Sequence, residues 1–285
     1  MQATQSSPAT HSAILCAERA HGPLSLGLLV SGLRQRLHFQ DRHQQLVMLD
    51  AADDAALQVV ADHLAAGIDP ARVTVFAPQQ VPELAALRAQ LAAHAPEAVR
   101  GTAAVLAALQ PGFVSPQAAD AIVVADANRV IRAINQRAGS DLLTEARPLL
   151  AGRSPFAMPR APLDVPFSAD ADTLAAAIDA IPPGAALGLP AKETEGHPLF
   201  QLLDVFERDI HFLDDLKSKF RRGGLSERVI RAHLIDRAEQ ALAPLRERRA
   251  ELLADRAALT RVLDEGAEQV RTSAAAALAR LAVLN

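Results

Sequence analysis

The residues best placed to do chemistry lie between Ile14 and Leu28, where an apolar run leads into a turn of small residues. Gly22 and Gly27 belong to this turn, and an apolar helical pattern follows it. A strand, a glycine-rich turn and a helix in this order direct the N–H groups of the helix N-terminus at a phosphate. The stretch therefore predicts a nucleotide-binding turn built on Gly22, Gly27 and His21. The plainer interpretation of His21 is an exposed turn histidine.

Such a turn has to be held by alternating strands and helices, and the first half of the chain has that pattern. Short apolar runs predict strands at 14–17, 45–49 and 73–76, and helical patterns follow at 23–40, 53–66 and 82–94. Asp53 and Asp54 are expected to cap the second helix, which Gly67 ends, so they are not interpreted as a catalytic pair. The alternation predicts an α/β fold with a Rossmann-like parallel sheet.

The rest of the chain is less regular at first and then helical. Helices are expected at 102–109, 126–137 and 170–181, a loop at 111–116, an extended segment at 149–166 and a hinge at 182–190. From His197 onward apolar residues recur at helical spacing, with a kink or restart at Pro244. These patterns divide the chain into a disordered tail (1–12), a Rossmann-like domain (13–168) and an all-helical domain (169–285).

The composition excludes several classes of site. Cys16 is the single cysteine, which excludes an intrachain disulfide and a cysteine-based metal site. The histidines have no metal-ligand spacing, so no metal is assigned. No apolar run is long enough to span a membrane, and the polar start of the chain is unlike a signal peptide. A cytoplasmic protein without a membrane partner is expected.

Charge is distributed unevenly along the chain. The formal net charge is −4, yet residues 217–249 hold ten basic and four acidic side chains, a net charge of +6. A basic segment on an acidic body predicts an anionic partner. The alternative is a solvated helix face on which these charges form ion pairs.

Several stretches resemble bacterial tryptophanyl-tRNA synthetases, and the similarity runs almost end to end. They are 66–72 (AGIDPAR), 80–84 (QVPEL), 117–120 (QAAD), 195–200 (EGHPLF), 221–225 (RRGGL) and 242–250 (LAPLRERRA). The resemblance implies a shortened class I synthetase catalytic domain, a helical anticodon-binding domain and a homodimer. It also implies a reaction in which ATP activates tryptophan and tRNA then accepts it.

Class I synthetases hold the phosphates of ATP with two signatures, and the resemblance implies that both are altered here. Ser25 and Leu28 stand where the first signature has histidines, and leucine has no hydrogen-bond donor. The second, a mobile lysine loop, corresponds to 157–161, where Ala157 replaces a lysine and Arg160 alone keeps a charge.

The substrate pocket also looks reduced. Gln117 and Asp120 correspond to the substrate side of the family's pocket, although they could equally brace the sheet. The segment that normally follows is absent, and 123–128 is interpreted as its shortened remnant.

Three functions fit these observations. The first is a pseudoenzyme that no longer activates tryptophan and binds tRNA or a protein, such as a true synthetase. The candidate RNA contacts are Arg221, Arg222, Arg246, Arg248 and Arg249. The second is a divergent active ligase, which would need ATP, Mg²⁺ and substitute cations. The third is a sensor of tryptophan, an indole or a nucleotide. The absence of Trp residues from the chain favours a tryptophan sensor, whereas this function does not explain the absence of Tyr residues. No catalytic residue or cofactor is assigned.

Overall fold

The computed structural model describes residues 13–94, 101–115, 118–149 and 164–284. Five strands form one parallel sheet in the order β3-β2-β1-β4-β5. They are β1 (Ile14–Glu18), β2 (Gln45–Leu49), β3 (Val73–Phe76), β4 (Phe113–Val114) and β5 (Arg147–Pro148). This is the strand order of a Rossmann-type sheet, so the predicted fold class is confirmed.

Side chains of alternate strand residues enter two separate cores, one on each face of the sheet. Ile14 and Cys16 belong to the core that includes α3 (Asp54–Ala66), whereas Leu15 belongs to the core that includes α4 (Pro82–His94). Because successive strand side chains point to opposite faces, a sheet buried on both sides has apolar residues at every position. That explains why the first strands appear in the sequence as continuous apolar runs.

The helix that follows the turn has an irregular first part. It begins as α1 (Leu26–Leu28), continues as a π-helical segment (Leu29–Leu33) and ends as α2 (Arg34–Phe39). The predicted caps of α3 are confirmed, because Asp53 accepts hydrogen bonds from Ala55 and Ala56 and Gly67 takes a left-handed φ of 103°. Strands 45–49 and 73–76 and helix 82–94 are also confirmed at both ends.

Three expectations for the chain beyond residue 110 differ from the structure. The loop expected at 111–116 contains β4, which pairs with β1 in the middle of the sheet. Helix α6 (Ala118–Ala138) starts earlier than expected, so the segment 123–128, interpreted as a shortened remnant, lies inside a helix. The restart considered at Pro244 does not occur, since α10 (Glu227–Ala254) continues through this residue. Most of the segment expected to be extended at 149–166 lies outside the described residues.

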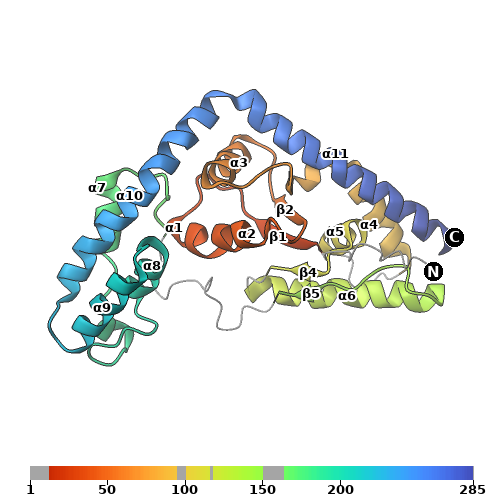
Figure 1. The fold of residues 1–285 in the computed structure, drawn as a ribbon. Helices are drawn as coiled ribbons and strands as arrows, with labels where there is room; N and C mark the ends of the chain where they lie inside the picture. Colours follow the sequence, from red (N-terminus) through yellow and green to blue (C-terminus); the bar gives the residue numbers. More distant parts are fainter. Residues whose placement is uncertain (1–12, 95–100, 116–117, 150–163, 285) are drawn as a thin grey trace, which may run out of the picture.

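The C-terminal half is helical, as predicted. It consists of α7 (Ala171–Asp179), a 3-10 turn (Gly184–Leu187), α8 (Pro198–Phe206), α9 (Ile210–Arg221), α10, α11 (Arg256–Leu281) and a final 3-10 turn (Ala282–Leu284). Between α10 and α11 the chain bends at Asp255, and the two helices form an arch above α3 (Figure 1). Helix α10 packs against α3, α7 and α8. Helix α11 packs against β3, α4 and α5 (Gly101–Leu109).

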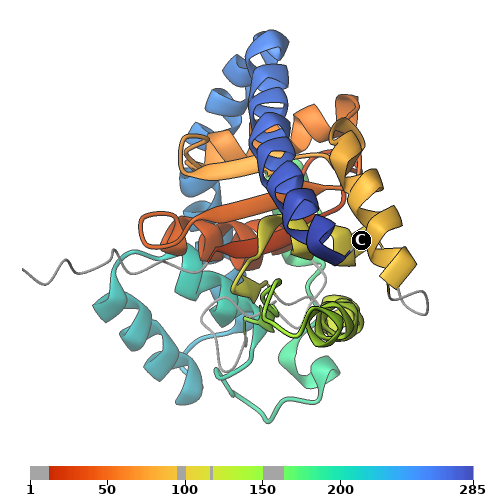
Figure 2. The same cartoon turned by 90° about the vertical axis from the view of Figure 1, so that its right-hand side faces the viewer.

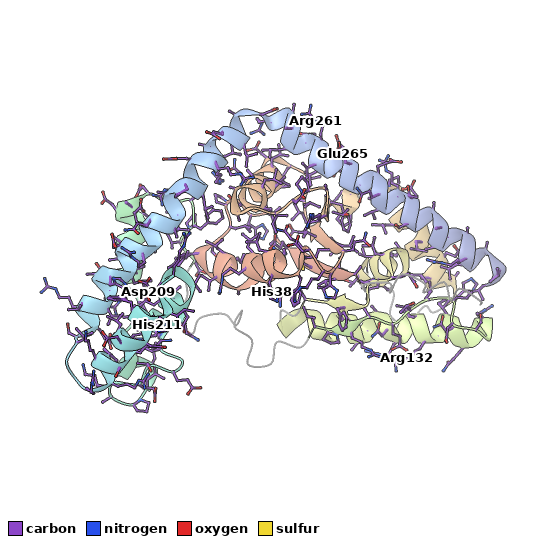
Figure 3. All side chains as sticks on the ribbon, in the orientation of Figure 1. His38, Arg132, Asp209, His211, Arg261 and Glu265 are labelled. Atoms are coloured by element: carbon purple, nitrogen blue, oxygen red, sulfur yellow. The ribbon has the colours of Figure 1, made fainter. Side chains whose placement is uncertain are left out.

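The contact between α11 and β3 is very close at one glycine. A Cβ atom on Gly266 would lie 1.9 Å from the carbonyl oxygen of Val75, so only glycine fits there. Arg261 and Glu265 lie on the outer side of α11, away from the sheet (Figure 3). The view turned by 90° shows α11 running across the sheet domain (Figure 2). The last helix is therefore part of the body of the molecule and not only of the helical region.

Candidate nucleotide-type turn and basic helices

The turn after β1 has the backbone shape that the sequence predicts. Gly22 has a φ of 118°, a conformation that side-chain-bearing residues rarely adopt. Ser25 is the N-cap of α1, and its Oγ accepts a hydrogen bond from the N–H of Leu28 at 3.3 Å. Ser25 therefore closes the helix end, which is the capping role that serine commonly has.

Three backbone donors of the turn, the N–H groups of Ala20, Leu24 and Leu26, already have acceptors within the protein. The N–H of Ala20 donates to Asp50 Oδ1 at 2.6 Å, and that of Leu24 donates to Asp62 Oδ2 at 2.5 Å. The N–H of Leu26 donates to the carbonyl of Val165 at 2.8 Å. A phosphate arriving at these three groups would have to displace protein acceptors.

A short extended segment lies across the turn. Ser25 forms an antiparallel bridge with Pro166, and the N–H of Phe167 donates to the carbonyl of Leu24 at 3.1 Å. Phe167 is fully buried and belongs to the core beneath. This cover comes from residues 165–167, a few residues after 157–161, the segment that resembles the mobile loop of the synthetases. Ala157 and Arg160 themselves lie outside the described residues.

Among the other predicted turn residues, His21 is the one whose side chain could hydrogen-bond to a ligand. Gly27 is buried, and the side chain of the half-buried Leu28 cannot donate. His21 is exposed, and no described residue binds its ring. The turn thus keeps the shape expected of a nucleotide site, with one imidazole at its rim.

Beneath the turn lies a buried ion pair that the sequence did not reveal. Asp62, on α3, is fully buried and pairs with Nε of Arg249 on α10. Burial raises the pKa of Asp62, while the N–H of Leu24 and the charge of Arg249 oppose that rise. The guanidinium of Arg249 also donates to Gln58 on α3. One carboxylate therefore joins the turn to the arch.

A second buried cluster lies at the end of β1. Glu18 Oε1 lies 2.5 Å from Arg36 Nη1, and its Oε2 lies 3.1 Å from His63 Nε2. The Nδ1 of His63 lies 2.8 Å from the carbonyl of Val59. Burial favours the neutral acid, but Arg36 and His63 outweigh it and lower the pKa of Glu18 to about 2. Glu18 is therefore a structural anion and not a proton donor at neutral pH.

One feature of the sequence points to these two buried clusters, namely the position of Asp62 and His63 next to apolar residues on helix α3. Asp62 and His63 follow Val59, Val60 and Ala61 on α3, and all five are buried. Charged side chains are rarely buried without partners, so this placement indicates a buried polar network. The partners, however, come from distant parts of the chain.

The basic segment is largely paired, as the alternative interpretation of its charge expected. Six of its ten cations form ion pairs: Lys217, Lys219, Arg231, Arg237, Arg246 and Arg249. Four are exposed and pair with no described residue: Arg221, Arg222, Arg228 and Arg248.

The predicted RNA contacts do not lie together. Arg221 and Arg222 are at the end of α9, at the tip of the helical region, near Gly223 with its φ of 82°. Arg248 is roughly 30 Å away, since about 20 residues of α10 separate it from Arg228 at about 1.5 Å each. Arg246 binds Glu239, and Arg249 is only 12% exposed, so Arg249 serves to hold the protein together.

The remaining site predictions concern the pocket, metals and membranes. Gln117 lies outside the described residues, and Asp120 falls in the first turn of α6, where side chains are not described. Among the described residues no group of three or more His, Cys, Asp or Glu side chains is arranged to hold a metal ion. Within the same residues no helix combines the length and apolar character needed to cross a membrane.

Comparison with known proteins gives a consistent relationship. No family model matches the chain. It is 28% identical to the tryptophan–tRNA ligase of Streptococcus pyogenes serotype M3, over 94% of this chain and 96% of the relative. Against that of Streptococcus pneumoniae serotype 4 the identity is 25%, with the same coverage of both chains.

Structural similarity extends over the same length. Tryptophanyl-tRNA synthetase from Campylobacter jejuni, crystallised with ADP and tryptophan, superposes with a TM-score of 0.76. Its identity is 18%, and the match covers 94% of this chain and 97% of that structure. End-to-end sequence relatives and a shared fold agree with the stretches that first suggested this relationship. The chain is therefore similar over almost its whole length to tryptophanyl-tRNA synthetases, in sequence and in fold.

Proposed function

We propose that this protein no longer activates tryptophan and acts by binding RNA, with tRNA as the expected ligand. The observation that carries the proposal is that N–H groups of the turn already donate hydrogen bonds to acceptors within the protein. Leu24 and Leu26 direct their N–H groups at Asp62 and Val165, and Leu28 has no side-chain donor. Activation of tryptophan puts negative charge on the α-phosphate and the leaving pyrophosphate, which requires donors aimed at them.

The size of the loss supports the same conclusion. Each missing transition-state donor costs about 2–4 kcal/mol by analogy with oxyanion holes. Three such losses would remove most of the catalytic rate even if their effects are not additive. The altered positions Ser25, Leu28, Ala157 and Arg160 point in the same direction. The turn would then be retained for its structural role and not for binding phosphate.

The helical region from residue 169 onward is the proposed working part. Arg221, Arg222 and Arg228 surround the exposed turn between α9 and α10, and phosphates of RNA are natural partners for such guanidinium groups. We expect the protein to act as a dimer, either with itself or with an active synthetase.

An ATP–pyrophosphate exchange assay with tryptophan tests the loss of activity. Exchange at background level is expected, with the Campylobacter jejuni enzyme as a positive control. A rate near that of the control would overturn the proposal.

A second candidate is a divergent active ligase. It is favoured by relatives named tryptophan–tRNA ligase that match 94% of the chain. Exchange that requires tryptophan and is abolished by His21→Ala, but not by substitution of the exposed His211, would support it. His211 lies beside Asp209 at the start of α9, far from the turn (Figure 3).

A further inference from the structure

An open cavity of about 830 Å³ lies between the end of β2, the turn at Pro78 and Gln79, and the helices α4 and α5. Its wall is mainly apolar, with Met48, Leu49, Leu84, Val105 and several alanines of α4. It shares no residue with the turn at 20–28 or with Asp62. Small-molecule sites are commonly about 300–1,000 Å³ and apolar with a few polar groups. The volume and the wall therefore fit a compact organic ligand.

Two of the polar side chains in the wall are already engaged. Asp50 Oδ1 accepts from the N–H of Ala20, and Gln79 Nε2 donates to the carbonyl of Asp50 at 2.5 Å. Arg88 and Thr102 differ, since no described residue hydrogen-bonds to the guanidinium or the hydroxyl. The unused groups are thus a cation and a hydroxyl donor beside an apolar wall.

This combination selects a class of ligand. A guanidinium presents two parallel N–H donors that match a carboxylate, and the apolar wall favours a hydrocarbon body. The carboxylate of Asp50 lies in the same wall, and its charge disfavours a doubly charged group such as phosphate. We propose that this cavity binds a monocarboxylate with an aryl or branched alkyl body, held by Arg88 and Thr102.

The proposal is independent of whether tryptophan activation is lost. Titration of 4-phenylbutyrate into the full chain by calorimetry should give saturable binding with a Kd of ~0.1–1 mM, which is ordinary for about twelve non-hydrogen atoms. The neutral isostere 4-phenylbutanamide should bind at least about tenfold more weakly, because an amide cannot form the charged pair with Arg88. Inorganic phosphate should not compete.

Variants identify the site. Arg88→Gln should weaken 4-phenylbutyrate binding at least about tenfold, since it removes the charge-assisted pair. The matched control is Arg137→Gln, an exposed arginine of α6 without a partner among the described residues, and it should leave binding unchanged. Ala89→Trp should fill the cavity and abolish binding. Both Arg88→Gln and Ala89→Trp should keep the thermal unfolding midpoint of the parent.

Three results would overturn the proposal. The first is the absence of saturable binding of 4-phenylbutyrate to the parent up to ~5 mM, several times the weakest expected Kd. The second is equal affinity of the parent and Arg88→Gln for 4-phenylbutyrate. The third is competition by phosphate as effective as that by 4-phenylbutyrate itself. Because the chain contains no Trp or Tyr, the residue added by Ala89→Trp also reports the folded state by its own fluorescence.

Discussion

At the scale of single residues, the state of the turn depends on one buried carboxylate. Asp62 accepts the N–H of Leu24 and pairs with Arg249 from a position 187 residues away in the sequence. The backbone shape of the turn could be predicted from Gly22 and Gly27, because it is a local property. The occupation of the turn's N–H groups could not be predicted, because the groups that accept their hydrogen bonds come from α3 and from residue 165.

Arg249→Met should destabilise the protein by about 3–5 kcal/mol, because it leaves the charge of Asp62 buried and unpaired. The neighbouring Arg248→Met serves as the control and should change the free energy of unfolding by less than about 0.5 kcal/mol, since Arg248 is exposed. Urea unfolding followed by circular dichroism measures both. Equal effects would mean that the Asp62–Arg249 pair does not hold the arch to α3.

Glu18 predicts a specific dependence of stability on pH. Its pKa falls from 4.5 unfolded to about 2 folded, so its contribution is full above pH 4.5 and is lost as the pH falls towards 2. The loss amounts to about 3 kcal/mol at about 1.4 kcal/mol per unit. The double variant Glu18→Leu with Arg36→Met replaces the pair by apolar groups and should lose this dependence.

The measurement is the free energy of unfolding between pH 2 and pH 5 for the parent and the double variant. Glu145→Gln, at an exposed carboxylate, is the control and should follow the parent. A double variant with the same slope as the parent would show that acid sensitivity arises elsewhere.

At the scale of elements, long periodic segments could be predicted from the sequence. Short segments, and those that depend on contacts with distant parts of the chain, could not. Strands β2 and β3 and helix α4 were located to the residue, because their apolar runs and caps are local. Strand β4 spans two residues, too few for any periodicity, and its pairing with β1 defines it. Pro244 stays within α10 because it is exposed, so the carbonyl of Gln240 that it leaves unpaired can bind water.

Gly266→Ala should separate α11 from β3, because the new methyl group would lie 1.9 Å from the Val75 carbonyl oxygen. We expect a loss of about 3 kcal/mol, the upper end of ordinary overpacking effects. Gly32→Ala is the control, since its Cβ would come no closer than 3.9 Å to its neighbours. Thermal unfolding compares them, and an unchanged midpoint for Gly266→Ala would contradict the close packing of α11.

At the scale of the whole molecule, the arch carries the proposed RNA surface at one end and covers the sheet with the other (Figure 1). The overall charge asymmetry could be predicted from composition. Which cations remain free could be predicted only in part. Lys219, Arg231 and Arg237 pair with acids within four residues of them in the sequence. Lys217 and Arg249, in contrast, pair with Asp204 and Asp62 on other helices.

Arg221→Gln with Arg222→Gln should weaken tRNA binding and lower the slope of log affinity against log salt by about 1–2, one unit per lost phosphate contact. Arg137→Gln with Arg147→Gln, on α6 and β5 at the far side of the molecule, is the control with the same charge change. Gel-shift titrations at several salt concentrations measure the slopes. Identical slopes for the two double variants, or no binding by the parent at low salt, would contradict the RNA surface.

The central claim is that the turn at residues 20–28 is closed to a triphosphate, and the most direct test is equilibrium binding of Mg²⁺–ATP to the full chain. Calorimetry should detect no saturable binding up to ~1 mM ATP, the upper end of ordinary KM values. Binding in the micromolar range that is lost on Gly22→Val, a substitution incompatible with the φ of 118° at that position, would contradict the claim.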